Sequence, residues 1–271
     1  MNRINQRFES LRQQGRKALV SYVVMGDPAK EITLPVMNAL VESGTDIIEL
    51  GIPFSDPNAE GPVIQRAHER ALENGSSLKD ALALVKQFRE TNTDTPVLLM
   101  GYTNPVERMG YDSFIDQAVD SGVDAVLTVD LPPEEAEEFN QHLRQANLEN
   151  IFLLAPTSTH ERQKKVTDMA GGFIYYVSLK GVTGAGHLDV DSVRENVTNI
   201  RSLTDLPVCV GFGIKDGASA RAVADLSDGV VVGSVLVNQI AQLAEQGESD
   251  PAVYASAISA IITEIRQALD C

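Results

Sequence analysis

Two glutamates separated by a proline-rich loop are the residues best placed for acid–base chemistry in this sequence. The apolar run over residues 46–50 carries Glu49 near its end, and the loop that follows carries Glu60. A carboxyl group at the end of a buried strand costs free energy unless it is paired or used. Glu49 is therefore either a core glutamate with satisfied hydrogen bonds or a general acid or base at the mouth of a barrel.

The length and composition of the chain are typical of one α/β domain. It has 271 residues, and α/β barrels of roughly 250 residues routinely form a single domain. The hydrophobic fraction of 43% is enough for one large core, so we expect a single barrel domain over residues 1–271. No apolar run reaches the roughly 18 residues of a membrane span, and the N-terminus lacks the apolar core of a signal peptide.

Charge and cysteine content narrow the classes of partner and compartment. The net charge is −16 and no patch is rich in lysine or arginine, which argues against a nucleic-acid partner. The two cysteines, Cys209 and Cys271, form no disulfide framework, which indicates a reducing cytoplasm. The histidines are not spaced as metal ligands, so we expect no metal site. They are His68, His142, His160 and His187.

Short β-rich runs alternate with segments of helical period along the chain. This alternation predicts a parallel sheet, and eight units in about 250 residues predict a closed (β/α)8 TIM barrel. Residues 3–14 predict an extra N-terminal helix. An open doubly wound sheet is the alternative, weakened because no G-x-G-x-x-G follows the first strand. The predicted strands are Ala18–Val24, Asp46–Leu50, Pro96–Met100, Asp124–Val129, Asn150–Leu154, Phe173–Val177, Pro207–Gly211 and Gly229–Gly233.

Prolines and acids mark two helix starts. Residues 132–135 are two prolines followed by two glutamates, and residues 249–251 read Ser-Asp-Pro. A first helical turn favours both kinds of residue, because its N–H groups are free and the helix dipole attracts negative charge. We therefore expect helices to begin at 132–135 and at 251.

Glycine-rich strand ends predict a phosphate site. In a (β/α)8 barrel, active residues follow the carboxyl ends of the strands, and phosphate binds after the seventh and eighth. The seventh run leads into Gly211-Phe212-Gly213-Ile214 and the eighth into Gly233-Ser234, directly before an apolar helical segment. Glycines let backbone N–H groups approach an anion, and a helix N-terminus adds a favourable dipole. An ordinary helix cap is the alternative for Gly233-Ser234.

Other strand ends carry a second loop and several aromatic residues. Residues 180–186 contain three glycines, which is typical either of a lid that closes over substrate or of an ordinary exposed connection. Tyr22, Tyr102, Asp130 and Tyr175 fall at or near strand ends. The tyrosines there are suited to an apolar pocket for a flat ligand, although each alone is more often a packing residue.

Six motifs in order give the chain a family resemblance. They are ELGIPFSDP from Glu49, GP at Gly61, DLPPEE from Asp130, YYVSLKGVTG from Tyr175, GFGI from Gly211 and DGVVVGS from Asp228. With these motifs, over nearly its whole length, the sequence resembles the α subunit of tryptophan synthase. The resemblance implies retro-aldol cleavage of indole-3-glycerol phosphate to indole and glyceraldehyde 3-phosphate, without a cofactor in this chain. It also implies an α2β2 heterotetramer, in which a β subunit carries pyridoxal phosphate and joins indole to serine.

The resemblance also implies roles for individual residues. Glu49 matches the catalytic acid/base, and Glu60 matches a catalytic aspartate that stabilises positive charge on the indole ring. The resemblance places β-subunit docking at Phe54–Glu60, Asn104-Pro105 and Pro132–Glu135. The implied substrate-binding residues are Tyr22, Met100, Tyr102, Leu127, Tyr175 and Thr183, with Thr183 on the closing loop. The implied phosphate-binding residues are Gly184, Phe212, Gly213, Gly233 and Ser234.

Three departures from the family pattern leave alternatives open. Glu60 is one methylene longer than the aspartate, Asn58 replaces an apolar residue, and Tyr22 replaces a phenylalanine. Because a carboxylate displaced by about 1 Å can cost on the order of a hundredfold in rate, the chain is either a lyase or an impaired relative that mainly activates its β subunit. A Schiff-base aldolase using Lys180 is a further alternative, which requires burial to lower the pKa of that lysine.

Overall fold

Nine strands form one parallel sheet in the part of the chain that the computed structural model describes, residues 2–178, 190–211 and 213–271. Along the sheet the order is β5-β4-β3-β2-β1-β9-β8-β7-β6. The strands are β1 (Ala18–Val24), β2 (Ile47–Gly51), β3 (Val97–Gly101), β4 (Ala125–Thr128), β5 (Glu149–Asn150), β6 (Phe152–Leu154), β7 (Ile174–Val177), β8 (Val208–Gly211) and β9 (Gly229–Val232).

The two outermost strands of this order are consecutive in the chain, which closes the sheet. β5 pairs with β4 and β6 pairs with β7, and only Ile151 separates β5 from β6. The Ile151 N–H donates to the carbonyl oxygen of Val126 at 2.9 Å, so pairing with β4 continues up to the crossing point. The predicted (β/α)8 barrel is therefore confirmed, with the fifth predicted strand split in two. The other seven predicted strands agree with the observed ones to within one residue at each end.

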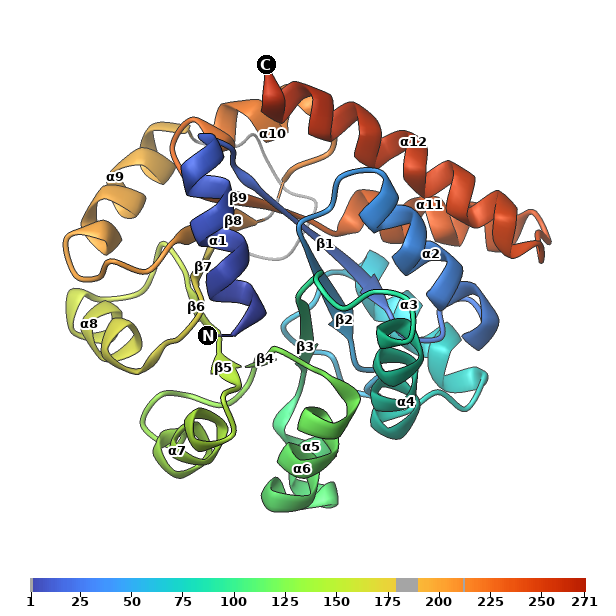
Figure 1. Ribbon diagram of the computed structural model, residues 1–271, viewed down its shortest axis with the longest axis horizontal. Coiled ribbons are helices and arrows are strands. Elements are labelled where there is room, and N and C mark those ends of the chain that lie inside the picture. Colours follow the sequence, from blue (N-terminus) through green and yellow to red (C-terminus); the bar gives the residue numbers. More distant parts are fainter. Residues whose placement is uncertain (1, 179–189, 212) are drawn as a thin grey trace.

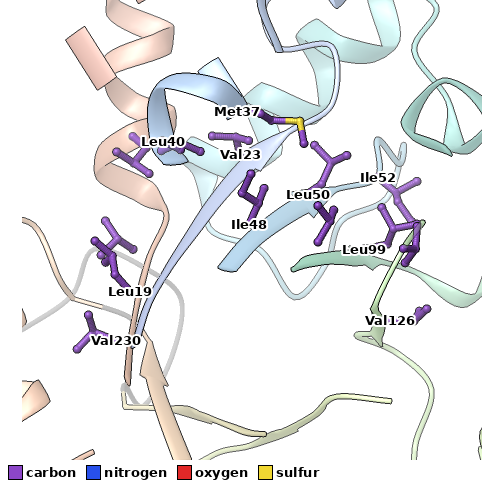
Figure 2. Packing of buried hydrophobic residues seen from close by; sticks show 14 of the residues in the cluster. Leu19, Val23, Met37, Leu40, Ile48, Leu50, Ile52, Leu99, Val126 and Val230 are labelled. Atoms are coloured by element: carbon purple, nitrogen blue, oxygen red, sulfur yellow. The ribbon is translucent and has the colours of Figure 1, made fainter. Parts of the chain in front are cut away.

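Side chains alternate between the inside of the barrel and its helix-covered outside. Ile47 and Leu98 belong to a cluster inside the barrel. Ile48 and Leu50, by contrast, pack outward in the cluster that contains Met37 of α2 (Lys30–Glu42), as Figure 2 shows. Both faces of the strands are thus buried, which is the pattern that near-continuous apolar runs predict.

Helices surround the barrel (Figure 1). No helix in the described part of the chain is long and apolar enough to cross a membrane. Besides α2, they are α1 (Arg3–Gln14), α3 (Pro62–Glu73), α4 (Leu78–Arg89), α5 (Thr103–Met109), α6 (Tyr111–Ser121), α7 (Glu137–Gln145), α8 (His160–Met169), α9 (Val190–Arg201), α10 (Gly217–Ala224), α11 (Ser234–Glu245) and α12 (Pro251–Asp270).

The predicted N-terminal helix is confirmed as α1, and it covers the end of the barrel where the strands begin. Its Ile4, Phe8 and Leu11 side chains belong to the same apolar cluster as the inner barrel residues. The Phe8 ring lies 5.7 Å from the ring of Phe173, which directly precedes β7. Because this end is filled by α1, a substrate site belongs at the other end, where the strands stop.

One of the two predicted helix starts is wrong. Residues 132–135 form a turn, in which the Glu135 N–H donates to the Pro132 carbonyl oxygen at 3.0 Å, and α7 begins only at Glu137. A residue that precedes proline is disfavoured in the α conformation, so the first proline cannot start the helix easily. Glu137 and Glu138 therefore supply the acids of the first turn.

The predicted start of the last helix is confirmed. α12 begins at Pro251, and the side chain of Asp250 accepts a hydrogen bond from the Ala252 N–H at 2.9 Å. Its predicted apolar face packs on the protein, with Ile261 half-buried and the others buried. These others are Tyr254, Ile258, Ile262, Ile265 and Leu269.

Candidate active site

Glu49 points into the barrel close to the carboxyl end of β2. It follows Ile47 by two residues, and Ile47 belongs to the inner cluster. Its register neighbours are Tyr22 on β1 and Leu98 on β3. The side chain is 0% exposed, and neither carboxyl oxygen has a hydrogen-bond partner within residues 2–178, 190–211 and 213–271. A purely structural core glutamate would need such partners.

Burial changes the protonation of Glu49. Loss of solvent, and secondarily the negative charge of Glu60, raise the pKa of Glu49 from 4.5 to about 8. The group therefore carries a proton at neutral pH and is a candidate general acid.

Glu60 lies in the loop between β2 and α3, and it is buried. Only 6% of the residue is exposed, which contradicts a solvated loop acid. The loop backbone is fixed around it, since the Glu60 N–H donates to the Pro57 carbonyl oxygen at 3.0 Å and the Gln65 amide donates to the Glu60 carbonyl oxygen at 2.9 Å. Burial raises the pKa of Glu60 to about 7, lower than that of Glu49.

Two buried tyrosines stand beside this pair, each above a glycine of the next strand. A Cβ atom on Gly51 would collide with the Tyr22 hydroxyl, and one on Gly211 would lie 2.6 Å from the Tyr175 hydroxyl oxygen. Burial raises the pKa of both phenols, and the charges of Glu49 and Glu60 raise them further. The glycines at these strand ends therefore make room for aromatic rings beside the carboxyl pair.

Two apolar side chains continue the wall of the barrel mouth. Met100 on β3 and Leu127 on β4 are direct register partners. Leu127 is buried in the inner cluster, and Met100 is half-buried against it. Both were predicted as substrate-binding residues, and the fold brings them to the same side of the sheet as Glu49.

Tyr102 holds the loop that carries Glu60. Its hydroxyl oxygen accepts a hydrogen bond from the Ala59 N–H at 3.1 Å. Its ring stacks on Phe54, with ring centroids 4.9 Å apart and an interplanar angle of 25°. Asp130, the other polar residue predicted near a strand end, is exposed and accepts hydrogen bonds from the Thr103 N–H and hydroxyl. Tyr102 thus supports the site, whereas Asp130 ties the loop after β4 to the start of α5.

The predicted phosphate corner lies at the ends of β8 and β9. Gly213 has φ +81°, a conformation that favours glycine, and a Cβ atom there would meet nothing within 4 Å among the described residues. Gly233 directly precedes α11, which begins at Ser234 without a side-chain cap in the described part of the chain. A Cβ atom on Gly233 would lie 3.3 Å from that of Tyr22, so this corner adjoins the aromatic wall.

Part of the predicted site falls outside the described residues. Thr183 and Gly184 of the predicted lid lie in the segment 179–189, as does Lys180 of the aldolase alternative. Phe212, predicted to bind phosphate, also lies outside the described residues.

His68 is a site residue that sequence reasoning missed. It was considered only as a possible metal ligand, but it lies on α3 with 2% exposure, 3.4 Å from the Tyr22 hydroxyl. Its Nδ1 accepts a hydrogen bond from the Phe54 N–H at 3.1 Å. The available signal was a polar residue on the apolar face of an amphipathic helix, four positions after Ile64.

Known sequences similar to this chain share one description. The sequence profile of the tryptophan synthase alpha chain family matches residues 8–265. The tryptophan synthase alpha chain of Thioalkalivibrio sulfidiphilus is 55% identical over 270 residues, which cover 100% of both chains. That of Marinobacter nauticus is 53% identical over 100% of this chain and 98% of its own.

Solved structures of similar chains share this fold. The tryptophan synthase subunit alpha of Legionella pneumophila superposes with a TM-score of 0.91 at 44% identity, covering 100% of this chain and 99% of its own. A chain of tryptophan synthase from M. tuberculosis, in an aminoacrylate-bound form, superposes with a TM-score of 0.87 at 34% identity, over 99% and 100% of the two chains.

Proposed function

This chain belongs to the tryptophan synthase alpha chain family, and on that premise we propose that it is a lyase that cleaves indole-3-glycerol phosphate to indole and glyceraldehyde 3-phosphate. The observation that carries the proposal is a pair of buried carboxyl groups at the barrel mouth, of which Glu49 is fully enclosed and has no hydrogen-bond partner among the described residues. The pKa of Glu49 is about 8 and that of Glu60 about 7. Two carboxyl groups whose environments separate their pKa values are suited to different roles in one reaction.

Glu49 acts first as an acid and then as a base. Its carboxyl proton is transferred to C3 of the indole ring, which leaves positive charge on the ring. The Glu49 carboxylate then takes the proton of the hydroxyl group on the carbon attached to C3. The bond between these carbons breaks, its electron pair returns to the ring, and the hydroxyl carbon becomes the aldehyde. Glu49 gives one proton and receives one, so the reaction needs neither water nor a cofactor in this chain.

Glu60 supplies the opposite charge for the ring. As the lower-pKa member of the pair, it is the carboxyl group that ionises first. We place its carboxylate against the indole N–H, where positive charge develops after protonation of C3. A charge fixed in a dry site stabilises such a transition state more strongly than it would in water. The loop contacts at Ala59 and Gln65 fix the backbone from which this side chain, one methylene longer than the family's aspartate, extends.

The remaining predicted residues hold the substrate. Met100, Leu127, Tyr22 and Tyr175 provide an apolar and aromatic wall that suits the flat indole ring. We place the phosphate at Gly213, Gly233 and Ser234, where the start of α11 and an unobstructed backbone favour an anion. The net charge of the chain is −16, which repels an anionic substrate, so the phosphate must be held by local groups of this kind.

The partner that consumes the indole is a tryptophan synthase β subunit. The M. tuberculosis relatives are chains of tryptophan synthase, and this chain covers 99% of its own length in that match. We assign pyridoxal phosphate to the β subunit and an α2β2 state to the complex. We also propose a cytoplasmic location, since the buried Cys209 and the exposed Cys271 are both free thiols.

Product analysis of the purified chain tests the proposal. Incubation with indole-3-glycerol phosphate should release indole and glyceraldehyde 3-phosphate in equal amounts, and borohydride should trap no covalent adduct. Release of neither product, with or without a β subunit, would reduce the chain to an activator of its partner.

A further inference from the structure

Two buried side chains from outside the loop accept hydrogen bonds from the backbone of the loop that carries Glu60. Near the start of the loop, the Phe54 N–H donates to Nδ1 of His68 on α3 at 3.1 Å. Near its end, the Ala59 N–H donates to the hydroxyl oxygen of Tyr102 at 3.1 Å. The backbone that leads to Glu60 is therefore held on both sides by residues of the surrounding barrel.

These two hydrogen bonds are connected through stacked aromatic rings. The Phe54 ring lies on the Tyr102 ring, with centroids 4.9 Å apart. The residue that His68 holds thus packs on the residue that holds Ala59, directly before Glu60. Groups in one contact network contribute to stability jointly, so loss of the Phe54 hydrogen bond should loosen the Ala59 contact as well.

The second ring nitrogen of His68 contacts a strand. A backbone N–H can only donate, so Nδ1, which accepts from Phe54, is unprotonated. Burial lowers the pKa of His68 to about 4, so the ring is uncharged at neutral pH and its proton is on Nε2. This N–H group makes a long hydrogen bond, 3.4 Å, to the hydroxyl oxygen of Tyr22 on β1. Tyr22 replaces the family's phenylalanine, and its additional hydroxyl group is the atom that holds His68.

An ion pair fixes the helix that carries His68. Arg70, two residues further along α3, donates to both carboxyl oxygens of Asp27 at 2.7 and 2.9 Å. The Asp27 side chain is fully buried in the loop after β1. A pair with two parallel hydrogen bonds constrains orientation as well as distance. The position of His68 is therefore set by β1 and the loop after it, independently of the loop that carries Glu60.

We propose that His68 is a positioning residue that holds the β2–α3 loop, and with it Glu60, in the arrangement that catalysis requires. The inference rests on the proposed function, in which the Glu60 carboxylate faces the indole ring. His68 acts through the Phe54 backbone and touches none of the reacting atoms. A catalytic group displaced by about 1 Å can cost on the order of a hundredfold in rate, so a loop without this contact should be much less effective.

Two amide variants separate the two nitrogens of His68. Asparagine places its oxygen near the position of Nδ1, so His68→Asn keeps an acceptor for the Phe54 N–H but does not reach Tyr22. Glutamine is longer and reaches the position of Nε2, so His68→Gln keeps a polar group at Tyr22 and loses the acceptor for Phe54. Thr45→Val is the control, because it removes a buried hydrogen bond to Ser21, 2.8 Å long, towards the other end of the barrel.

Nuclear magnetic resonance tests the contact without relying on activity. In the parent chain, the Phe54 amide nitrogen and His68 Nδ1 should show a scalar coupling across their hydrogen bond. The Phe54 amide hydrogen should exchange with solvent at least about tenfold faster in His68→Gln, and the Ala59 amide hydrogen should also exchange faster. In His68→Asn and Thr45→Val, both should stay within about threefold of the parent.

Two results would overturn the contact. They are absence of the scalar coupling in the parent and equal Phe54 exchange in the asparagine and glutamine variants. Because the coupling is measured on the parent chain, it decides whether His68 holds Phe54 even if a variant does not fold.

Indole release tests the consequence for catalysis. His68→Gln should lower kcat at least about tenfold and change KM less than about threefold, because the proposed indole wall and phosphate groups lie outside the loop. His68→Asn and Thr45→Val should keep kcat within about threefold of the parent. Faster Phe54 exchange in His68→Gln with an unchanged kcat would overturn the positioning role.

The same measurements separate this inference from the proposed function. If the parent releases no indole, the proposed function fails, and the catalytic part of the inference fails with it. The scalar coupling and the exchange rates would still decide whether His68 holds the loop. If the parent releases indole and His68→Gln does so equally fast, the proposed function stands and the role of His68 is wrong.

Discussion

The negative charge of Glu60 raises the pKa of Glu49, adding to the larger effect of burial on the same group. The influence is unequal, because burial alone accounts for the raised pKa of Glu60. Glu49 lies on a strand, whereas Glu60 lies on a loop. The distance between the two carboxyl groups therefore depends on the position of the loop. The contacts of Tyr102 and His68 with this loop therefore bear on the acidity of Glu49.

Substitution of Glu60 separates its charge from its length. Glu60→Ala should nearly abolish indole release, because the developing ring charge then lacks a counter-charge in a dry site. Glu60→Asp should keep kcat within about tenfold of the parent, which is about 1.4 kcal/mol. Steady-state indole release measures both. If Glu60→Ala released indole as fast as the parent, Glu60 would have no catalytic role.

Stability should fall as pH rises past neutrality because of Glu49. Its pKa is 4.5 in the unfolded chain and about 8 in the folded one, so between these values the folded state binds more protons. Stability from this group is complete below about pH 4.5 and is lost as pH rises to about 8. Glu49→Gln should therefore gain stability relative to the parent between pH 6.5 and 8.5.

Urea unfolding at pH 6.5 and 8.5 measures this gain. The range avoids His68, which destabilises the fold only when pH falls below its ordinary pKa of 6.5. Glu73→Gln makes the same change on the exposed surface of α3 and is the control. A pH dependence in Glu49→Gln equal to that of the parent would show that Glu49 is ionised already at pH 6.5.

A side chain on Gly213 should block phosphate. Gly213→Val should raise KM for indole-3-glycerol phosphate by at least about tenfold, because it fills space next to the backbone that we assign to the anion. Gly247→Val is the control. Gly247 also has a positive φ, +77°, and free space for a Cβ atom among the described residues. It lies after the C-terminal end of α11, whereas the proposed phosphate site lies at the N-terminal end, at Ser234. Similar KM values in the two variants would place the phosphate elsewhere.

The β subunit should increase turnover by docking on the loops around the mouth. Asn104 is exposed in the first turn of α5, within the predicted docking surface. Asn104→Arg should raise the β-subunit concentration for half-maximal stimulation by about tenfold, or about 1.4 kcal/mol. Asn199→Arg, on an exposed position of α9, should not. If Asn104→Arg and Asn199→Arg needed the same β-subunit concentration for half-maximal stimulation, Asn104 would not belong to the docking surface.

Strand positions could be predicted well because burial on both faces leaves a continuous apolar run in the sequence. The split of the fifth strand at Ile151 could not, since it depends on which neighbours pair with each half. The start of α7 was missed because proline and acids mark a turn as readily as a helix. Local composition therefore located the elements, and tertiary pairing set their ends.

The site could be predicted only in part. Glu49 stands out because a carboxyl group interrupts an apolar strand, and Gly213 because glycines end another. The loop around Glu60 is fixed by contacts with His68 on α3, the next helix, and with Tyr102 after β3, and these contacts form only in the folded barrel. No local pattern reveals that His68 joins Tyr22 to Phe54, because its partners are defined by the closed barrel.

Single-turnover indole release by Glu49→Gln tests the central claim most directly. Glutamine keeps the shape of the side chain but cannot give a proton to C3 or accept one from the hydroxyl group. With saturating indole-3-glycerol phosphate and a bound β subunit, the rate should fall at least about 10²-fold, as for loss of a general acid–base group. Substrate affinity and the folded state should be retained. Release of indole by this variant at a rate close to that of the parent would contradict the assignment of Glu49.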